Sequence, residues 1–177
     1  IAAANMAKEL KNVDPNRVYI LGASQGGYVL PRIAEGITDA AGFIFMSSPA
    51  EHMKNYLTEQ YEYLAMEDGA ISLNEHTIIN QVTTQINLLE QASSIPEEDK
   101  VFGFYKNYWI DLKAYNPIVD ANKITAPVLL LQGERDYQVN LKQYNLWMNA
   151  FFEAENWTFK AYPDLNHFMM KGEGNSY

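Results

Sequence analysis

Residues 17–35 constrain the fold of this 177-residue chain more than any other segment. Residues 17–21 form a short apolar run of β-rich composition, which predicts a buried strand. The sequence Gly22-Ala23-Ser24-Gln25-Gly26 follows, and residues 25–35 then return to helical spacing, with a kink expected at Pro31. The segment therefore predicts a strand, a tight turn and a helix in succession, with Ser24 presented on the turn.

The spacing Gly-x-Ser-x-Gly is weak evidence alone, because both residue types are common, and the preceding strand strengthens it. We expect Gly22 and Gly26 to let neighbouring backbone approach closely. The helix that begins after the turn directs its free N–H groups and positive dipole end at the serine, so the N–H of Gln25 could stabilise an oxyanion. The simpler alternative is that Ser24 only caps a glycine-rich helix.

Further strands and helices alternate along the chain. Residues 1–12 have the alanine-rich content of a helix, and residues 13–16 read as a turn. Strands are expected at 42–46, 128–131 and 157–162, and an amphipathic helix at 141–154. The first two of these strands are continuous apolar runs, as expected of parallel strands covered on both faces. The pattern predicts an α/β fold in which helices flank a parallel sheet.

The segment 51–115 differs from its surroundings, because it lacks strand-like alternation and is rich in Glu, Asn and Gln. We expect it to be a helical cap inserted into a core made of residues 1–50 and 116–177. Ser72 and Glu75 predict a capping box at the start of one helix. Three apolar stripes are more simply explained by packing than by substrate binding: Met53, Leu57, Tyr61 and Leu64; Ile78, Val82, Ile86 and Leu89; and Phe102, Tyr105, Trp109 and Leu112.

A serine hydroxyl needs a nearby base and a third group that orients this base. The chain has only three histidines. His52 and His76 lie in the polar insertion, where we expect surface roles. His167 follows the predicted strand 157–162, in a loop at its carboxyl end, where the functional residues of parallel sheets gather. His167 is therefore the candidate base for Ser24.

Asp136 follows the strand 128–131 at the corresponding end, so three predicted strands each deliver one group to the same edge of the sheet. The chain order of serine, aspartate and histidine also fits. Taken singly, Asp136 could merely form a turn and His167 could be an ordinary loop residue. Glu134 and Asp164 are rival acids, but Glu134 lies closer to its strand and Asp164 is only three residues from the histidine.

The composition of the chain excludes several classes of partner and of chemistry. Asp and Glu number 22 against 13 Lys and Arg, a formal net charge of −9 that disfavours nucleic acid and anionic membranes as partners. The absence of cysteine excludes disulfides and thiolate catalysis. No apolar run approaches the roughly 20 residues of a membrane-spanning helix. The chain starts at Ile1 within a predicted helix, so we treat it as a fragment, and its compartment stays open.

Three motifs carry a resemblance to known proteins: LGASQGG at 21–27, LQGERDY at 131–137 and LNHF at 165–168. In these the chain resembles bacterial α/β-hydrolases of the esterase, dienelactone-hydrolase-like and prolyl-oligopeptidase-like branch. Ser24 stands where dienelactone hydrolases proper have cysteine and haloalkane dehalogenases have aspartate. The resemblance implies acyl transfer through a serine ester without a cofactor or metal, with Ser24 as nucleophile, His167 as base and Asp136 as acid.

The same resemblance implies a sheet of about eight strands, in which the loop after the third strand donates a second oxyanion N–H. That loop would precede Ile1, so this chain should hold the last four strands and be poorly active alone. Its first strand should present an unpaired edge. We expect missing N-terminal residues, a partner chain or a second copy in a homodimer to cover that edge.

These observations predict a serine hydrolase that cleaves small carboxylic esters. The Tyr and Trp content of the insertion would suit a medium-sized or aromatic acyl or alcohol group. A serine peptidase of the prolyl-oligopeptidase-like type is the first alternative. The second is a non-catalytic binding domain that kept the hydrolase fold, which would require a broken triad.

Overall fold

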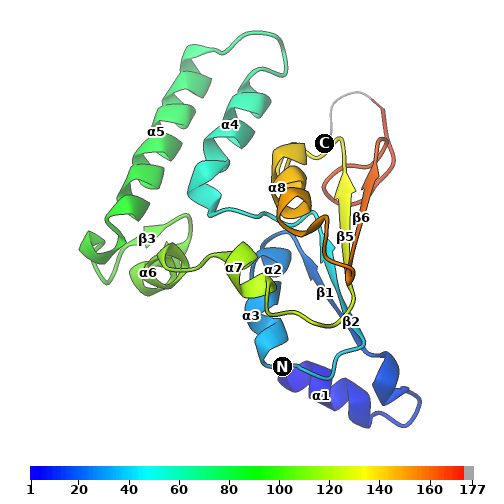
Figure 1. Cartoon of the computed structure of the whole chain (residues 1–177). Helices are drawn as coiled ribbons and strands as arrows, with labels where there is room; N and C mark the ends of the chain where they lie inside the picture. The colour runs from blue at the N-terminus through cyan, green and yellow to red at the C-terminus, as the bar shows by residue number, and fades with distance from the viewer. Residues whose placement is uncertain (174–177) are drawn as a thin grey trace. The chain divides into compact units, whose positions relative to one another are not determined.

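The computed structural model describes residues 1–173, and its contacts divide the chain into two units (Figure 1). The first unit comprises Ile1–Glu51 and the segment from Asn116 onward, and the second is His52–Tyr115. The second unit begins one residue after the predicted insertion 51–115 and ends at the same residue. Its role as a cap stays a prediction.

The first unit is built on a four-stranded sheet in the order β1-β2-β5-β6, in which every neighbouring pair is parallel. The strands are β1 (Tyr19–Ala23), β2 (Gly42–Met46), β5 (Val128–Gly133) and β6 (Trp157–Tyr162). This confirms the predicted α/β class. The strand predicted at 17–21 starts at Tyr19 instead, because a 3₁₀ turn, η1 (Pro15–Arg17), capped by the Asp14 side chain, precedes it.

The helices of this unit are α1 (Ala2–Glu9), α2 (Gln25–Tyr28), α3 (Leu30–Glu35), α7 (Pro117–Ala121) and α8 (Leu141–Phe151). The helix predicted at 25–35 is divided in two at Val29. Pro31 lies in the first turn of α3, where its missing N–H requires no partner. The proline therefore marks a new helix start and not a kink within one helix.

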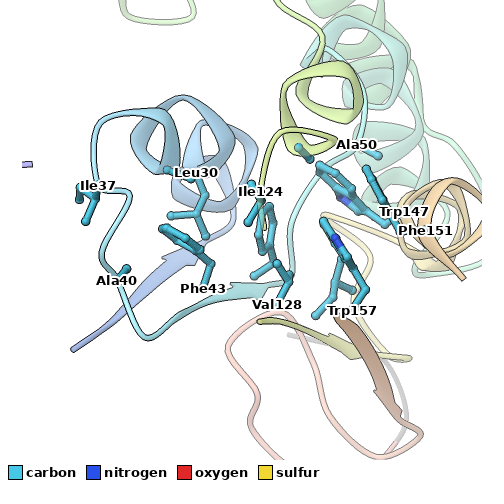
Figure 2. Close-up of a cluster of buried hydrophobic side chains, with 14 of the residues drawn as sticks. Leu30, Ile37, Ala40, Phe43, Ala50, Ile124, Val128, Trp147, Phe151 and Trp157 are labelled. Atoms are coloured by element: carbon cyan, nitrogen blue, oxygen red, sulfur yellow. The ribbon is translucent and has the colours of Figure 1, made fainter. Parts of the chain in front are cut away.

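The core of this unit is a cluster of buried apolar side chains, and its part next to α8 is aromatic (Figure 2). Trp147 of α8 stacks on Trp157 of β6 with ring centroids 5.7 Å apart, and Phe151 stacks on the same indole at 4.2 Å. The Trp147 indole N–H donates to the Ser48 carbonyl at 3.0 Å, so its one polar atom is satisfied in the interior. This packing fixes α8 above β5 and β6.

Burial alternates along the strands of the sheet. Phe45 and Leu130 are fully buried, whereas Leu21 on β1 is 53% exposed. The expectation that both faces are covered is therefore wrong for the described residues, because their apolar core lies on one face. The opposite face of the sheet is also apolar. Apolar residues on both faces explain why these strands are continuous apolar runs in the sequence. In the described sheet, β1 is an edge strand.

The second unit consists of η2 (Met53–Asn55), α4 (Leu57–Ala65), α5 (Leu73–Glu90), η3 (Ala92–Ser94), β3 (Lys100–Val101), β4 (Phe104–Tyr105) and α6 (Lys106–Lys113). Both hydrogen bonds of the predicted capping box are present between Ser72 and Glu75. Among residues 1–173, no helix is both long and apolar enough to cross a membrane.

Two details of the second unit differ from the predicted stripes. Residues 100–105 form a hairpin of two-residue strands, turned at Phe102 and Gly103 in positive φ. Strands this short show no alternation of apolar and polar residues in the sequence. The hairpin places Phe102 outside helix α6. Trp109 and Leu112 of the same predicted stripe are buried as expected. Ile78 on α5 is 39% exposed, so its stripe is only partly buried.

His52 was expected at the surface, and this is wrong. The side chain is half-buried, its Nδ1 accepts the Lys54 backbone N–H at 3.2 Å, and its ring lies 6.0 Å from that of Trp109. Burial lowers the pKa of His52 below its usual value of 6.5, the Lys54 charge lowers this pKa further, and Glu90 opposes both effects. His76, by contrast, is exposed on α5 as expected.

The lowered pKa of His52 predicts acid-sensitive stability. Because the folded chain takes up this proton less readily than the unfolded chain, stability is retained above the usual pKa and lost as pH falls through the lower, folded value. His52→Asn keeps an acceptor for the Lys54 N–H but does not titrate. Between about pH 7.5 and about pH 5.5 the wild type should lose more thermal stability than this variant. Equal losses in melting experiments would contradict this prediction.

Candidate active site

Ser24 sits on a strained turn between β1 and α2, with φ 51° and ψ −122°, a conformation that residues other than glycine rarely adopt. Its N–H donates to Met46 O at 2.8 Å, and its own carbonyl accepts the Gly27 N–H at 2.9 Å. A Cβ on Gly22 would lie 2.5 Å from Gly26 O, so only glycine fits there. Strain of about 1–3 kcal/mol is typical of such residues and concentrates at functional sites.

The expected close approach at Gly26 is wrong, because a Cβ there would meet nothing within 4 Å. The tight contact occurs one residue later. A Cβ on Gly27 would lie 2.6 Å from the Ser48 side chain, since this turn of α2 packs on the segment after β2. The first and last glycines of the motif Gly22-Ala23-Ser24-Gln25-Gly26-Gly27 are therefore the ones that sterics require.

Asp136 and His167 face each other in the interior. The Asp136 Oδ2 atom lies 2.8 Å from His167 Nδ1, and the two residues are 3% and 8% exposed. Asp136 Oδ1 accepts the N–H groups of Gln138 at 2.9 Å and Val139 at 2.8 Å, which orient the carboxylate. With a carboxylate at Nδ1, the proton belongs on that nitrogen, which leaves Nε2 as the acceptor.

The loops that carry Asp136 and His167 touch through their backbones. Arg135 N–H donates to Leu165 O at 3.0 Å. A Cβ on Gly133 would lie 2.4 Å from Leu165 O, closer than real Cβ atoms approach an oxygen. The absence of a side chain at Gly133 therefore allows the histidine loop to close over the end of β5.

The turn of Ser24 and the loop of His167 are held by consecutive residues at the end of β2. Met46 O accepts the Ser24 N–H, and the next residue, Ser47, donates its hydroxyl to His167 O at 3.0 Å. Ser47 is 1% exposed and has φ 47°. The carboxyl ends of β1, β2, β5 and β6 thus gather the segments of Ser24, Asp136 and His167 at one edge of the sheet.

The two rival acids lie elsewhere. Asp164 is exposed, with its carboxylate 3.7 Å from the Lys171 ammonium, and Glu134 is exposed directly after β5. Of these acids, Asp136 is the one whose carboxylate faces the imidazole. Gln25, the expected oxyanion donor, is the first residue of α2, immediately after Ser24. Among the described residues, no group of three or more His, Asp and Glu side chains could hold a metal ion.

Ser47 and Gln132, to which no sequence pattern assigns a role, are both buried beside these loops. Ser47 directly follows a predicted strand, so its position at the carboxyl edge of the sheet could be predicted from the sequence. Gln132 belongs to the motif at 131–137, but a glutamine on an apolar strand gives no sign of which loop its amide will contact.

Gly133→Ala should damage catalysis and stability together. The added methyl must push the histidine loop away, and overpacking of this kind costs about 1–3 kcal/mol. A displacement near 1 Å at a reacting group can lower turnover by about 10²-fold. Ester turnover and thermal melting would measure both effects. Gly26→Ala, where the structure leaves open space, is the control, and equal behaviour of the two variants would contradict the steric argument.

The parallel sheet, flanking helices and carboxyl-edge site are those of the α/β-hydrolase class. The profile of the prolyl oligopeptidase family matches residues 1–177, and the chain belongs to this family. It is 34% identical to Esterase EstD from Thermotoga maritima in an alignment 178 positions long, which covers 99% of this chain and 40% of that protein. The chain thus spans less than half the length of this relative.

Two solved structures support the same fold. Est1E from Butyrivibrio proteoclasticus with bound ferulic acid has a TM-score of 0.57 and 20% identity, covering 95% of this chain and 57% of that one. Acetyl xylan esterase 1 from a Thermoanaerobacterium species has a TM-score of 0.53 and 19% identity, covering 96% and 46%. At these identities the likeness concerns the fold alone.

Proposed function

We propose that this chain supplies the catalytic residues of a serine hydrolase that cleaves small carboxylic esters. The observation that carries the proposal is the buried 2.8 Å contact between Asp136 and His167, at the sheet edge where Ser24 occupies its strained turn. An orienting carboxylate, an imidazole whose Nε2 can accept a proton and a serine at such a turn are the parts that acyl transfer requires.

In the acylation step, Ser24 Oγ attacks the acyl carbon while His167 Nε2 takes the hydroxyl proton. Asp136 keeps the imidazole in the required tautomer and stabilises the imidazolium that forms. When the tetrahedral intermediate collapses, the imidazolium returns the proton to the departing alcohol. Water then attacks the ester on Ser24 with His167 again as base, which releases the acid and restores the hydroxyl.

The developing oxyanion needs donors placed in advance. The Gln25 N–H is the first candidate, because α2 begins at this residue and the positive end of a helix favours negative charge. In this hydrolase class the second N–H comes from a loop after an earlier strand. We expect the full-length gene product to supply that loop, and removing such a donor typically lowers turnover by about 10²- to 10³-fold.

Esters are the preferred substrate class because of the 34% identity to EstD across nearly this whole chain. Peptide hydrolysis is the second candidate, favoured by the membership in the prolyl oligopeptidase family. The same triad chemistry serves both, so substrate preference depends on the pocket around it. A non-catalytic binding domain is a weaker candidate, since all three triad residues are present.

Matched substrates would test the choice. The full-length protein should be assayed with a chromogenic ester and with an anilide of the same acyl group, and with acetyl and aromatic acyl groups in each series. We expect a higher kcat/KM for the esters. A higher kcat/KM for the anilides would overturn the ester proposal in favour of peptidase activity, and no turnover in either series would overturn both.

A further inference from the structure

We propose that Gln132 is a positioning residue for the triad acid, acting through Asp136 and not on the substrate. This inference rests on the proposed function and deepens it. Gln132 occupies the penultimate position of β5, is fully buried, and precedes the loop that carries Asp136.

The side-chain amide nitrogen of Gln132 bridges the two ends of the acid loop. It donates to Gly133 O at 2.9 Å, where the loop begins, and to Val139 O at 2.7 Å, where it ends. The same nitrogen lies 3.4 Å from Asp136 Oδ2, the oxygen that faces His167. The two hydrogens of this buried amide therefore hold the loop closed, and its nitrogen adds a weaker, shared contact to the carboxylate oxygen that faces the imidazole.

The orientation of this amide follows from its surroundings. All three neighbours of the nitrogen are acceptors, so a flipped amide would place its oxygen against two carbonyls and a carboxylate. In the present orientation the Gln132 Oε1 atom is buried without a hydrogen-bond partner among residues 1–173. A buried acceptor without a partner is destabilising, so the bonds made by the donor end are what account for an amide at this position.

Gln143 is a useful comparison, because it is a second fully buried glutamine in the same unit. Its Oε1 accepts the Ala50 and Glu51 N–H groups, and its Nε2 donates to the Glu51 carboxylate. Both ends of that amide are used, as expected of a purely structural residue. Gln132 uses only its donor end, and it directs that end at the acid loop.

The test replaces Gln132 with methionine in the full-length protein, because methionine keeps the volume but removes the donor. Removing the donor frees both ends of the loop that carries Asp136, and a small misplacement of a reacting group can lower turnover by about 10²-fold, so we expect kcat for ester hydrolysis to fall by about 10- to 100-fold. KM should change less than about twofold, because Gln132 does not touch the substrate. The low-field proton resonance of the His167 Nδ1–H group should shift or broaden in NMR spectra.

Asn156→Leu is the matched control. Asn156 donates its amide to Ile124 O and Ala126 O, both at 3.0 Å, next to the amino ends of β5 and β6. The Asn156→Leu variant should be less stable than the wild type, but its kcat and its low-field resonance should be unchanged. Wild-type kcat in Gln132→Met, or an equal kcat loss in both variants, would overturn the positioning role. The proposed function fails separately, if Ser24→Ala retains the wild-type ester activity.

Discussion

Ser24→Ala should abolish ester hydrolysis with little change in folding. Loss of the serine of a triad lowers kcat on the order of 10⁶-fold, because no covalent intermediate can form. Residual catalysis of about 10³- to 10⁴-fold over water is expected from the oxyanion donors and substrate binding. The substitution removes only a hydroxyl, and the backbone bonds of the turn stay in place. Kinetics with a chromogenic ester and a melting curve measure both quantities.

The control for this variant is Ser93→Ala, an exposed serine of η3 in the second unit. It removes the same hydroxyl from the same protein and should retain wild-type kcat. Wild-type ester activity in Ser24→Ala, with Ser93→Ala equally active, would refute the assignment of the nucleophile.

Asp136→Asn should lower kcat by about 10⁴-fold, the effect of losing the correct imidazole tautomer in a triad. Asparagine can still accept the N–H groups of Gln138 and Val139 through its oxygen. Its NH₂ group would then point at His167 Nδ1 and force that nitrogen to accept. The proton would move to Nε2, which could no longer take a proton from the serine. Ester kinetics would show this loss without a comparable fall in melting temperature.

The rival acids provide matched controls for this prediction. Asp164→Asn and Glu134→Gln make the same change of charge at exposed positions and should leave kcat near the wild-type value. If Asp164→Asn abolished activity while Asp136→Asn did not, the acid of the triad would have been misassigned.

The strands were predictable where local chemistry marks their ends. The segments 42–46 and 157–162 match β2 and β6 at both ends. The first is an apolar run, the second alternates apolar and polar residues, and polar or turn-forming residues follow each of them. β1 began two residues late, because Arg17 belongs to the preceding 3₁₀ turn. The hairpin at 100–105 was missed, because two-residue strands depend on contacts within the folded unit and not on local periodicity.

The sequence predicts those features of the candidate site that follow from the order of parallel strands. Residues that follow parallel strands meet at one edge, which was sufficient to bring Asp136 to His167. The contacts that support the site could not be predicted from the sequence. The bond from Ser47 to the carbonyl of His167 and the reach of Gln132 to Val139 depend on side-chain directions, which strand order does not specify.

Covalent labelling of the full-length protein with a fluorophosphonate, followed by mass spectrometry of its peptides, tests the central assignment most directly. We predict one adduct, on the peptide that contains Ser24, and a large loss of labelling in His167→Ala. An adduct on another residue, or labelling of Ser24 that does not depend on His167, would contradict the proposed triad.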